Sequence, residues 1–265
     1  MHHVAYWLRH TPMTEPGPLA LAFEKLPSDV ASLNRSAQGL LVHSEWLSAY
    51  GIDANTFCSV DRVTLAVSER LGELLKLDKR RLQVARAPAN RSAGTCRDFA
   101  LTLCSFLRAT GTPARLRCGF AAYLAEGWED HWVCEYWDRQ RGDWRHSDSQ
   151  LDEITRAQCG VGFDPSNVPR DLFLTGGEAW LRCRAGEQNS DRFGHGDVKG
   201  LWFIQVNVVR DAYAVNGRET SVWDEWREAP PELRRVLPEE LPRVDRLARR
   251  PENPPGNLTP AWLRL

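Results

Sequence analysis

Hydrophobic residues recur at helical spacing in three stretches of the first half of the chain. The spacing predicts helices over residues 28–50 and over about 60–77. A third helix begins at Cys96, has apolar positions one, three and four residues apart, and stops before Gly111. The arm over residues 1–27 holds four prolines and is predicted to be extended.

After the third helix the pattern changes to short runs rich in aromatic and β-branched residues. These runs cover residues 114–124, 131–137 and 143–149, and turn-forming residues separate them. The last two read as the strands of a hairpin joined around a polar turn. An α+β fold is therefore expected, with a helix packed on an antiparallel sheet.

The second half is less regular. Residues 172–185 are predicted to be helical, and residues 200–209 fit either a strand or a helix. Half of the sixteen prolines follow residue 229, so an extended tail is expected there, with one short helix near 239–250.

Length and composition indicate a folded chain that forms one domain. It has 265 residues, of which 42% are hydrophobic and 26% charged. The expected parts are a helical N-terminal segment, a catalytic core, a helix-and-strand extension and a proline-rich tail. Their bounds are 1–89, 90–152, 153–228 and 229–265.

Charge and cysteine usage exclude several classes of function. A net charge of −1 gives no field to attract nucleic acid or an anionic membrane. No apolar run has the length of a membrane span, and the N-terminus lacks the apolar stretch of a signal peptide. The seven cysteines form no CxxC pair and are expected to be reduced thiols of a cytoplasmic protein.

One of these thiols stands where a helix begins. Thr95 is a favoured N-cap residue, Asp98 can reach back to it, and Cys96 takes the first helical position. Unpaired N–H groups and the helix dipole stabilise a thiolate there, and they could also receive an oxyanion. Cys96 is therefore a candidate nucleophile, although most free cysteines are small buried hydrophobes.

A thiol nucleophile needs a base, and the base needs an orienting group. If Trp137 lies opposite Trp144 in the predicted hairpin, His131 is diagonal to Asp148 on the same face. Shifting the register by two residues brings His131 and Asp148 directly opposite each other, whereas a shift of one places their side chains on opposite faces of the sheet. His131 and Asp148 are thus the candidate base and orienter.

Other residues near this constellation are weaker candidates. His146 is the rival base, but in the first register Glu135 faces it and offers an ordinary polar contact. Trp46 and Asn90 are candidates for a second oxyanion donor. Substrate contacts are expected from Trp128, Trp132 and His146, and the tryptophans are equally explained as core residues.

The assembled motifs resemble the core of the transglutaminase-like superfamily, and bacterial transglutaminase-like proteins in particular. This resemblance implies a papain-like α+β fold with Cys96 as nucleophile, His131 as base and acid, and Asp148 as orienter. His146 departs from it, because such strands usually carry an apolar residue there. The motifs are Gly94-Thr95-Cys96, Leu107 to Arg115, Cys118-Gly119-Phe120, His131-Trp132 and Trp144 to Asp148.

The function expected from these residues is cysteine-dependent acyl chemistry. An acyl thioester would form from a small-molecule, peptide or carrier-bound donor and pass to an amine or to water. A protease or amidase, or a non-catalytic module with an aromatic groove, are the alternatives. Zinc at the three candidate residues, or at Asp191, His195 and Asp197, fits no familiar ligand spacing, so no metal or cofactor is expected.

Overall fold

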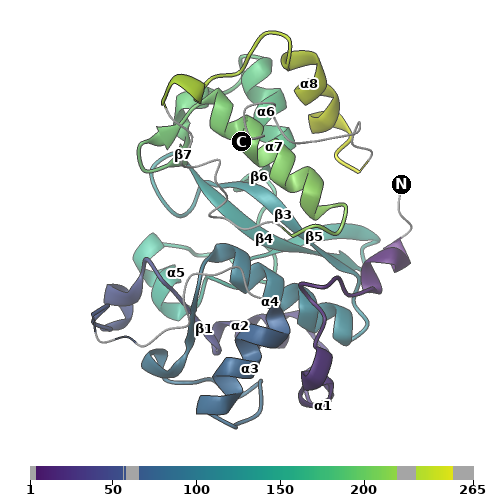
Figure 1. Ribbon diagram of the computed structural model, residues 1–265, viewed down its shortest axis with the longest axis vertical. Coiled ribbons are helices and arrows are strands. Elements are labelled where there is room, and N and C mark those ends of the chain that lie inside the picture. The colour runs from purple at the N-terminus through teal and green to yellow at the C-terminus, as the bar shows by residue number, and fades with distance from the viewer. Residues whose placement is uncertain (1–3, 56, 58–65, 220–230, 253–265) are drawn as a thin grey trace. The chain divides into compact units, whose positions relative to one another are not determined.

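The computed structural model describes residues 4–55, 57, 66–219 and 231–252, and it has an α+β fold (Figure 1). The predicted fold class is confirmed. The chain divides into two compact units. The first unit comprises residues 2–116 and 133–168, and the second comprises residues 117–132 and 169–265. The expectation of a single domain stays a prediction.

Helical turns replace the extended arm predicted at the N-terminus. The elements are η1 (Val4–Leu8), η2 (Gly17–Leu19) and α1 (Ala20–Phe23). Trp7 is 2% exposed and Phe23 is 5% exposed, so burial of these two side chains favours compact turns over an extended path. The prediction for this arm was therefore wrong in the residues that the structure describes.

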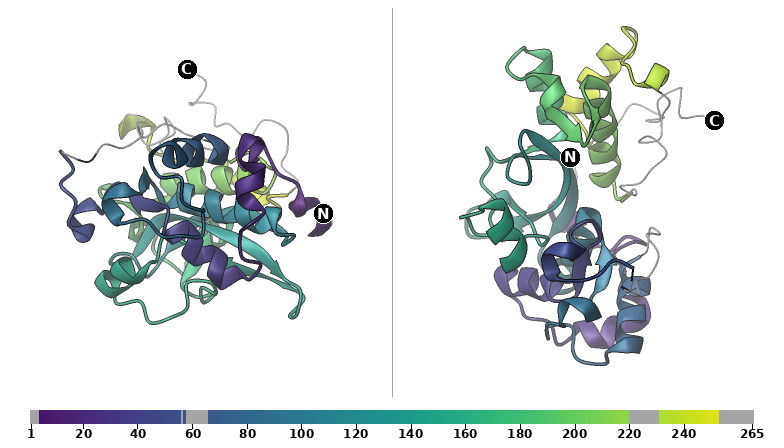
Figure 2. Two further views of the ribbon diagram at one scale, coloured as in Figure 1. Left: turned by 90° about the horizontal axis from the view of Figure 1, so that it is seen from below. Right: turned by 90° about the vertical axis from the view of Figure 1, so that its left-hand side faces the viewer.

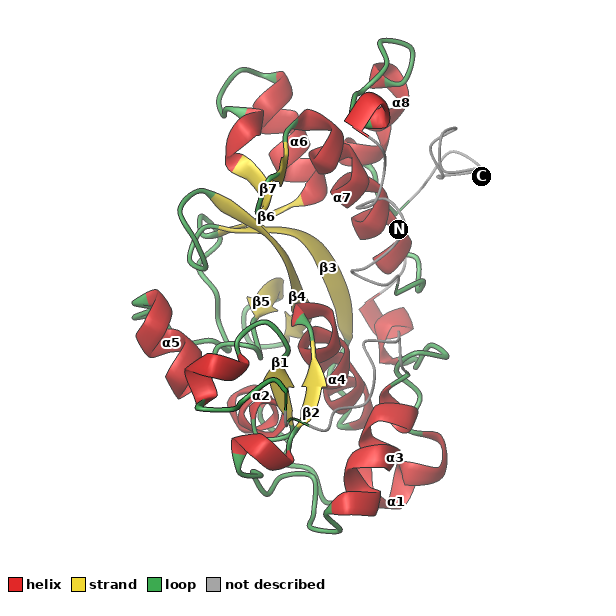
Figure 3. Cartoon of the chain, turned by 60° about the vertical axis from the view of Figure 1, so that its left-hand side comes forward, coloured by secondary structure: helices red, strands yellow, loops and turns green. Residues whose placement is uncertain are grey.

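The single helix predicted over residues 28–50 is also wrong. Helix α2 (Val30–Gln38) is capped by Asp29, whose carboxylate accepts the N–H of Ser32 at 2.8 Å. Strand β1 (Leu41–His43) and the 3₁₀ turn η3 (Leu47–Tyr50) follow. Strand β1 pairs in parallel with β2 (Ser92–Gly94), and the two strands lie side by side (Figure 3).

The next helices agree better with the apolar spacing. Helix α3 (Val67–Leu77) ends at the predicted residue, and its predicted start near residue 60 lies outside the described residues. A short turn, η4 (Pro88–Asn90), leads into β2. Helix α4 (Cys96–Ala109) has the predicted start and length, and its residues from 96 to 108 are all buried.

The predicted hairpin is present with the first of the two registers. Strand β4 (Trp128–Asp138) pairs antiparallel with β5 (Asp143–Ser147). In this register Glu135 faces His146 and Trp137 faces Trp144. Helix α5 (Glu153–Cys159) follows, and the Asp152 carboxylate caps it.

Five strands of the larger sheet lie in the order β6, β3, β4, β7 and β8. Their bounds are β3 (Ala114–Ala121), β6 (Phe173–Thr175), β7 (Phe193–His195) and β8 (Val198–Lys199), with η5 (Ser190–Arg192) before β7. Strand β7 joins β4 in parallel, so the sheet is mixed. At Gly119 a side chain would lie 2.0 Å from the carbonyl oxygen of Leu174, which explains a glycine at the closest approach of β3 and β6.

Three helices cover the core of this second unit, and they gather together in both views of Figure 2. They are α6 (Gly176–Arg184), α7 (Leu201–Ala214) and α8 (Leu241–Arg249), with η7 (Pro231–Leu233) before α8. The ambiguous segment 200–209 is thus helical, and the helix near 239–250 is confirmed. Residues 173–175 form strand β6, so the helix predicted over 172–185 begins later.

No helix in the described parts of the chain combines the length and apolarity needed to cross a membrane.

Candidate active site

The candidate nucleophile sits where β2 turns into α4. Thr95 has an extended backbone, with φ −116° and ψ 176°, and its N–H donates to the Asp98 carboxylate at 2.9 Å. Cys96 is the first residue of α4 and is 6% exposed. Cys96 therefore opens the helix as the sequence predicted, at the end where the first N–H groups have no partner inside the helix.

Asp98 fixes the geometry of this helix head through two arginines. Its carboxylate lies 3.1 Å from Arg70 of α3 and 3.3 Å from Arg97. Arg70 also donates to the Ser92 hydroxyl at 3.2 Å and to the carbonyl of Ala93. At Gly94 a Cβ would stand only 2.9 Å from that of Asp98, so the glycine makes room for the folded-back side chain. Sequence reasoning missed Arg70.

The candidate base, His131, lies on β4 in the second unit and is 1% exposed. The Tyr123 ring and its imidazole meet edge to face, with ring centroids 6.0 Å apart. The residue before it, Asp130, accepts a hydrogen bond from Asn207 of α7 at 2.8 Å. The residue before the imidazole is therefore held within this unit.

The candidate orienter, Asp148, follows β5 and is 1% exposed. Its N–H donates to the carbonyl of Pro165 at 2.8 Å, and its carboxylate accepts the N–H of Gln150 at 2.9 Å. Burial, and then the charge of Asp148, raise the pKa of the Cys159 thiol. The segment around Pro165 is thus hydrogen-bonded to the backbone of Asp148, a contact that the sequence did not predict.

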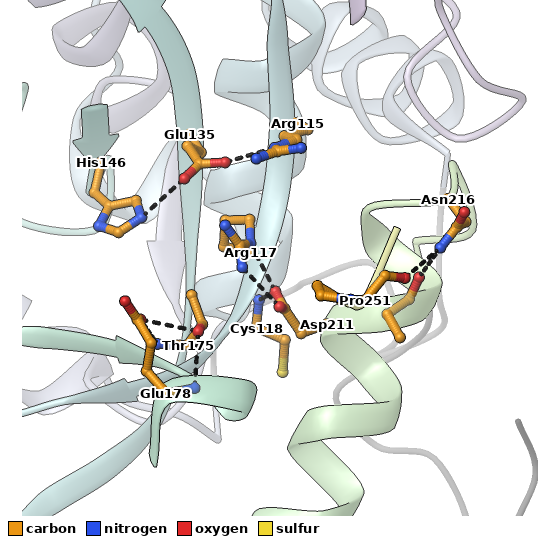
Figure 4. Close-up of polar contacts among 11 residues, drawn as sticks. Arg115, Arg117, Cys118, Glu135, His146, Thr175, Glu178, Asp211, Asn216 and Pro251 are labelled. Carbon is orange, nitrogen blue, oxygen red and sulfur yellow. Dashed lines mark hydrogen bonds and ion pairs between the residues drawn. The ribbon is translucent and has the colours of Figure 1, made fainter. Parts of the chain in front are cut away.

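His146 has the polar partner that its place in the hairpin predicted (Figure 4). Its Nε2 lies 3.3 Å from the Glu135 carboxylate, whose other oxygen accepts the Nε–H of Arg115 at 2.5 Å. Arg115 stacks on Trp144 with 4.4 Å between guanidinium carbon and ring centroid. These contacts give His146 a structural partner on its own strand pair.

Residues 49–149 match the family model of the transglutaminase-like superfamily. The matched range contains Cys96, His131 and Asp148. Over these residues the chain is similar to the transglutaminase-like superfamily. The match supports a cysteine-dependent enzyme.

One solved structure, from Cytophaga hutchinsonii and described as a "Putative Cysteine Protease", is similar to this chain with 17% identity and a TM-score of 0.40. The similarity covers 65% of this chain and 45% of that one, so the chain spans under half the length of that protein. A comparison with curated proteins gave no match.

The tryptophans expected around the candidate site project from different faces of the strand pair β4 and β5. Side chains alternate along a strand, so Trp128 and Trp132 leave one face and Trp137 leaves the other. Trp128 stacks on Phe193 with centroids 5.4 Å apart, and Trp132 is 1% exposed. Trp137 meets Trp144 edge-on. One shared aromatic groove is therefore not formed by these four rings.

Asn90 and Trp46 differ in their surroundings within the first unit. Asn90 is exposed and lines a cavity of about 650 Å³. Trp46 is half-buried in the turn after β1, where the Ser44 N–H donates to the carbonyl of Gly94 at 2.9 Å. The turn that carries Trp46 is thus hydrogen-bonded to Gly94, which lies two residues before Cys96 in the chain. The other residues lining the cavity are Ile52, Phe57, Leu77, Asp78, Lys79, Ala89 and Arg91.

Within residues 4–55, 57, 66–219 and 231–252, no group of three or more His, Cys, Asp and Glu side chains is arranged to hold a metal ion. In the glycine-rich loop that sequence analysis considered for zinc, the Nδ1 of His195 contacts the carboxylate of Glu129 on β4.

A buried tyrosine on β4 should make the free energy of unfolding fall as pH rises through the alkaline range. Tyr136 is 9% exposed, its hydroxyl donates to the carbonyl of Ser166 at 3.1 Å, and burial raises its pKa to about 12. The unfolded chain loses this proton near pH 10, about two units earlier than the folded chain. Between these values the folded state binds more protons, so stability falls as pH rises, by up to about 1.4 kcal/mol per unit.

Replacing Tyr136 by Phe should flatten this decline, although it also removes one hydrogen bond at every pH. Urea unfolding midpoints of the native and Tyr136→Phe proteins, taken from pH about 9 to 12, give both slopes. Parallel slopes would show that Tyr136 keeps an ordinary titration in the folded protein.

Proposed function

We propose that this protein is a cysteine acyltransferase that uses Cys96, His131 and Asp148. The observation that carries the proposal is the place of Cys96, the first residue of a capped helix, within a range that matches the transglutaminase-like superfamily. The donor is an amide, ester or thioester on a small molecule, peptide or carrier. The acceptor is an amine, with water as the competing acceptor.

In the first step, the Sγ of Cys96 attacks the carbonyl carbon of the donor. His131 takes the thiol proton and passes it to the leaving group as the bond from the carbonyl carbon to that group breaks. An acyl thioester on Cys96 remains. Asp148 holds the imidazole in the required tautomer and stabilises its protonated form.

The oxyanion of this step needs hydrogen-bond donors. The N–H of Cys96 is one, because the first N–H groups of α4 have no partner inside the helix. Trp46 is the better candidate for the second, since its turn is bonded to Gly94, whereas Asn90 is exposed at a cavity.

In the second step, an amine or water attacks the thioester. His131 removes the proton of the attacking group and returns a proton to the Cys96 sulfur, which leaves. With an amine the product is an amide, and with water it is a carboxylic acid. The same acyl-enzyme therefore accounts for transfer and for hydrolysis by a protease or amidase.

The test combines an acylating probe with a thiol probe. Native protein should hydrolyse p-nitrophenyl acetate, and Cys96→Ala should lose this activity. Iodoacetamide at neutral pH should alkylate Cys96 faster than Cys183, because burial raises the pKa of Cys183 to about 11. His131→Ala should slow the reaction of Cys96, and peptide mass mapping assigns each site.

The matched control is Cys183→Ser, which should leave ester hydrolysis and the alkylation of Cys96 unchanged. Turnover by Cys96→Ala equal to that of native protein would refute the proposed function.

A further inference from the structure

Helix α7 carries a stripe of buried polar side chains in a largely apolar sequence. Asn207, Arg210 and Asp211 stand three and four residues apart and therefore share one side of the helix. Each is at most 1% exposed. Burying such groups is costly unless each finds a partner, so their contacts are defined by the fold.

Two of these side chains bind the residue that precedes the candidate base. The amide nitrogen of Asn207 donates to one oxygen of Asp130 at 2.8 Å, and Arg210 lies 3.5 Å from the other. Arg210 also donates to the amide oxygen of Asn207 at 3.1 Å. Asp130, Asn207 and Arg210, called the clamp below, thus form a closed buried network on β4.

The same helix also binds the neighbouring strand. Asn207 contacts the carbonyl of Gly119 and the thiol of Cys118, each at 3.3 Å. Asp211 accepts the N–H of Cys118 at 3.0 Å and two guanidinium hydrogen bonds from Arg117 at 2.8 Å (Figure 4). Because α7 bonds both β3 and β4, the clamp fixes the place of β4 within this unit.

We propose that Asp130 and Asn207 are positioning residues for His131. Asp130 and His131 are adjacent and leave opposite faces of β4, so a clamp on one face holds the backbone from which the imidazole projects on the other. The Tyr123 ring packs against the imidazole itself. This inference rests on the proposed function, in which a displacement of about 1 Å in a reacting group costs about 100-fold in rate.

An exchange of the two side chains tests the clamp. Asn207→Asp alone places two carboxylates together in a buried site, where like charges repel. Asp130→Asn with Asn207→Asp restores one amide facing one carboxylate and keeps the net charge. We expect Asn207→Asp to lower kcat for p-nitrophenyl acetate by about tenfold to 100-fold with little change in KM, and the double variant to recover most of it.

The matched control is Asp245→Ala in the same unit. Asp245 accepts the Trp180 indole N–H at 2.7 Å and lies 3.4 Å from Arg184, so its removal should lower the unfolding midpoint and leave kcat unchanged. Circular dichroism should show all variants folded at the assay temperature. A purely structural clamp would behave as Asp245 does.

A second readout does not depend on turnover. NMR signals of the His131 ring, assigned with His131→Ala, should shift in Asn207→Asp and return in the double variant. Unchanged ring signals and kcat in folded Asn207→Asp would overturn the clamp. If native turnover proves independent of His131, the proposed function fails, and the ring signals alone decide whether the clamp positions this residue.

Discussion

Replacing Asp148 by Asn should lower kcat by about 10⁴-fold without unfolding the protein. The amide oxygen of Asn can still accept the Gln150 N–H that Asp148 accepts at 2.9 Å, so the local turn survives. An amide carries no negative charge, and it can hold an imidazole in the wrong tautomer. In the proposed mechanism, His131 would therefore lose the group that stabilises its protonated form.

Asp152→Asn is the matched control for this change. Asp152 lies four residues further on, caps α5 by accepting the N–H groups of Ile154 and Thr155 at 3.1 Å, and pairs with Arg91. Asn is also a good N-cap residue, so we expect kcat to stay the same and stability to fall by about 1 kcal/mol or less.

Steady-state kinetics with p-nitrophenyl acetate and urea unfolding compare the two variants. Equal losses of kcat in Asp148→Asn and Asp152→Asn would show that Asp148 only stabilises the turn after β5 and does not orient His131.

The parts of the site that the sequence predicted depend on neighbours along the chain. The head of α4 follows from Thr95 and Asp98, which are three residues apart. The hairpin, with Trp137 opposite Trp144 across a short turn, is one of the two registers that the sequence left open. Both patterns are read within a few residues, so the helix head could be predicted and the register reduced to two possibilities.

The parts that failed depend on distant residues. Residues 41–43 have the apolar pattern of a helix, but they pair with residues 92–94 and become a strand. Likewise, Arg70 reaches Asp98 from another helix, and Asn207 reaches Asp130 across 77 positions. No local spacing in the sequence predicts such partners, although they contact residues close to Cys96 and His131 in the chain.

The largest effect on stability should come from Asp211, because three donors converge on its buried carboxylate. Asp211→Ala leaves Arg117 without its ion pair and the N–H of Cys118 without its acceptor. Breaking a buried pair by removing one partner costs about 3–5 kcal/mol. Urea unfolding of Asp211→Ala should show a loss of this size.

Two further variants test whether this loss of stability comes from the unpaired buried charge. Asp191→Ala removes an exposed carboxylate from the same unit and should change stability by about 0.5 kcal/mol or less. Replacing both partners, Arg117→Met with Asp211→Leu, removes the uncompensated charge and should recover part of the loss. Recovery should stay incomplete, since the Cys118 N–H still lacks its acceptor, at a cost of about 1–3 kcal/mol. If Asp211→Ala were as stable as Asp191→Ala, the buried charges of α7 would not hold β3 in place.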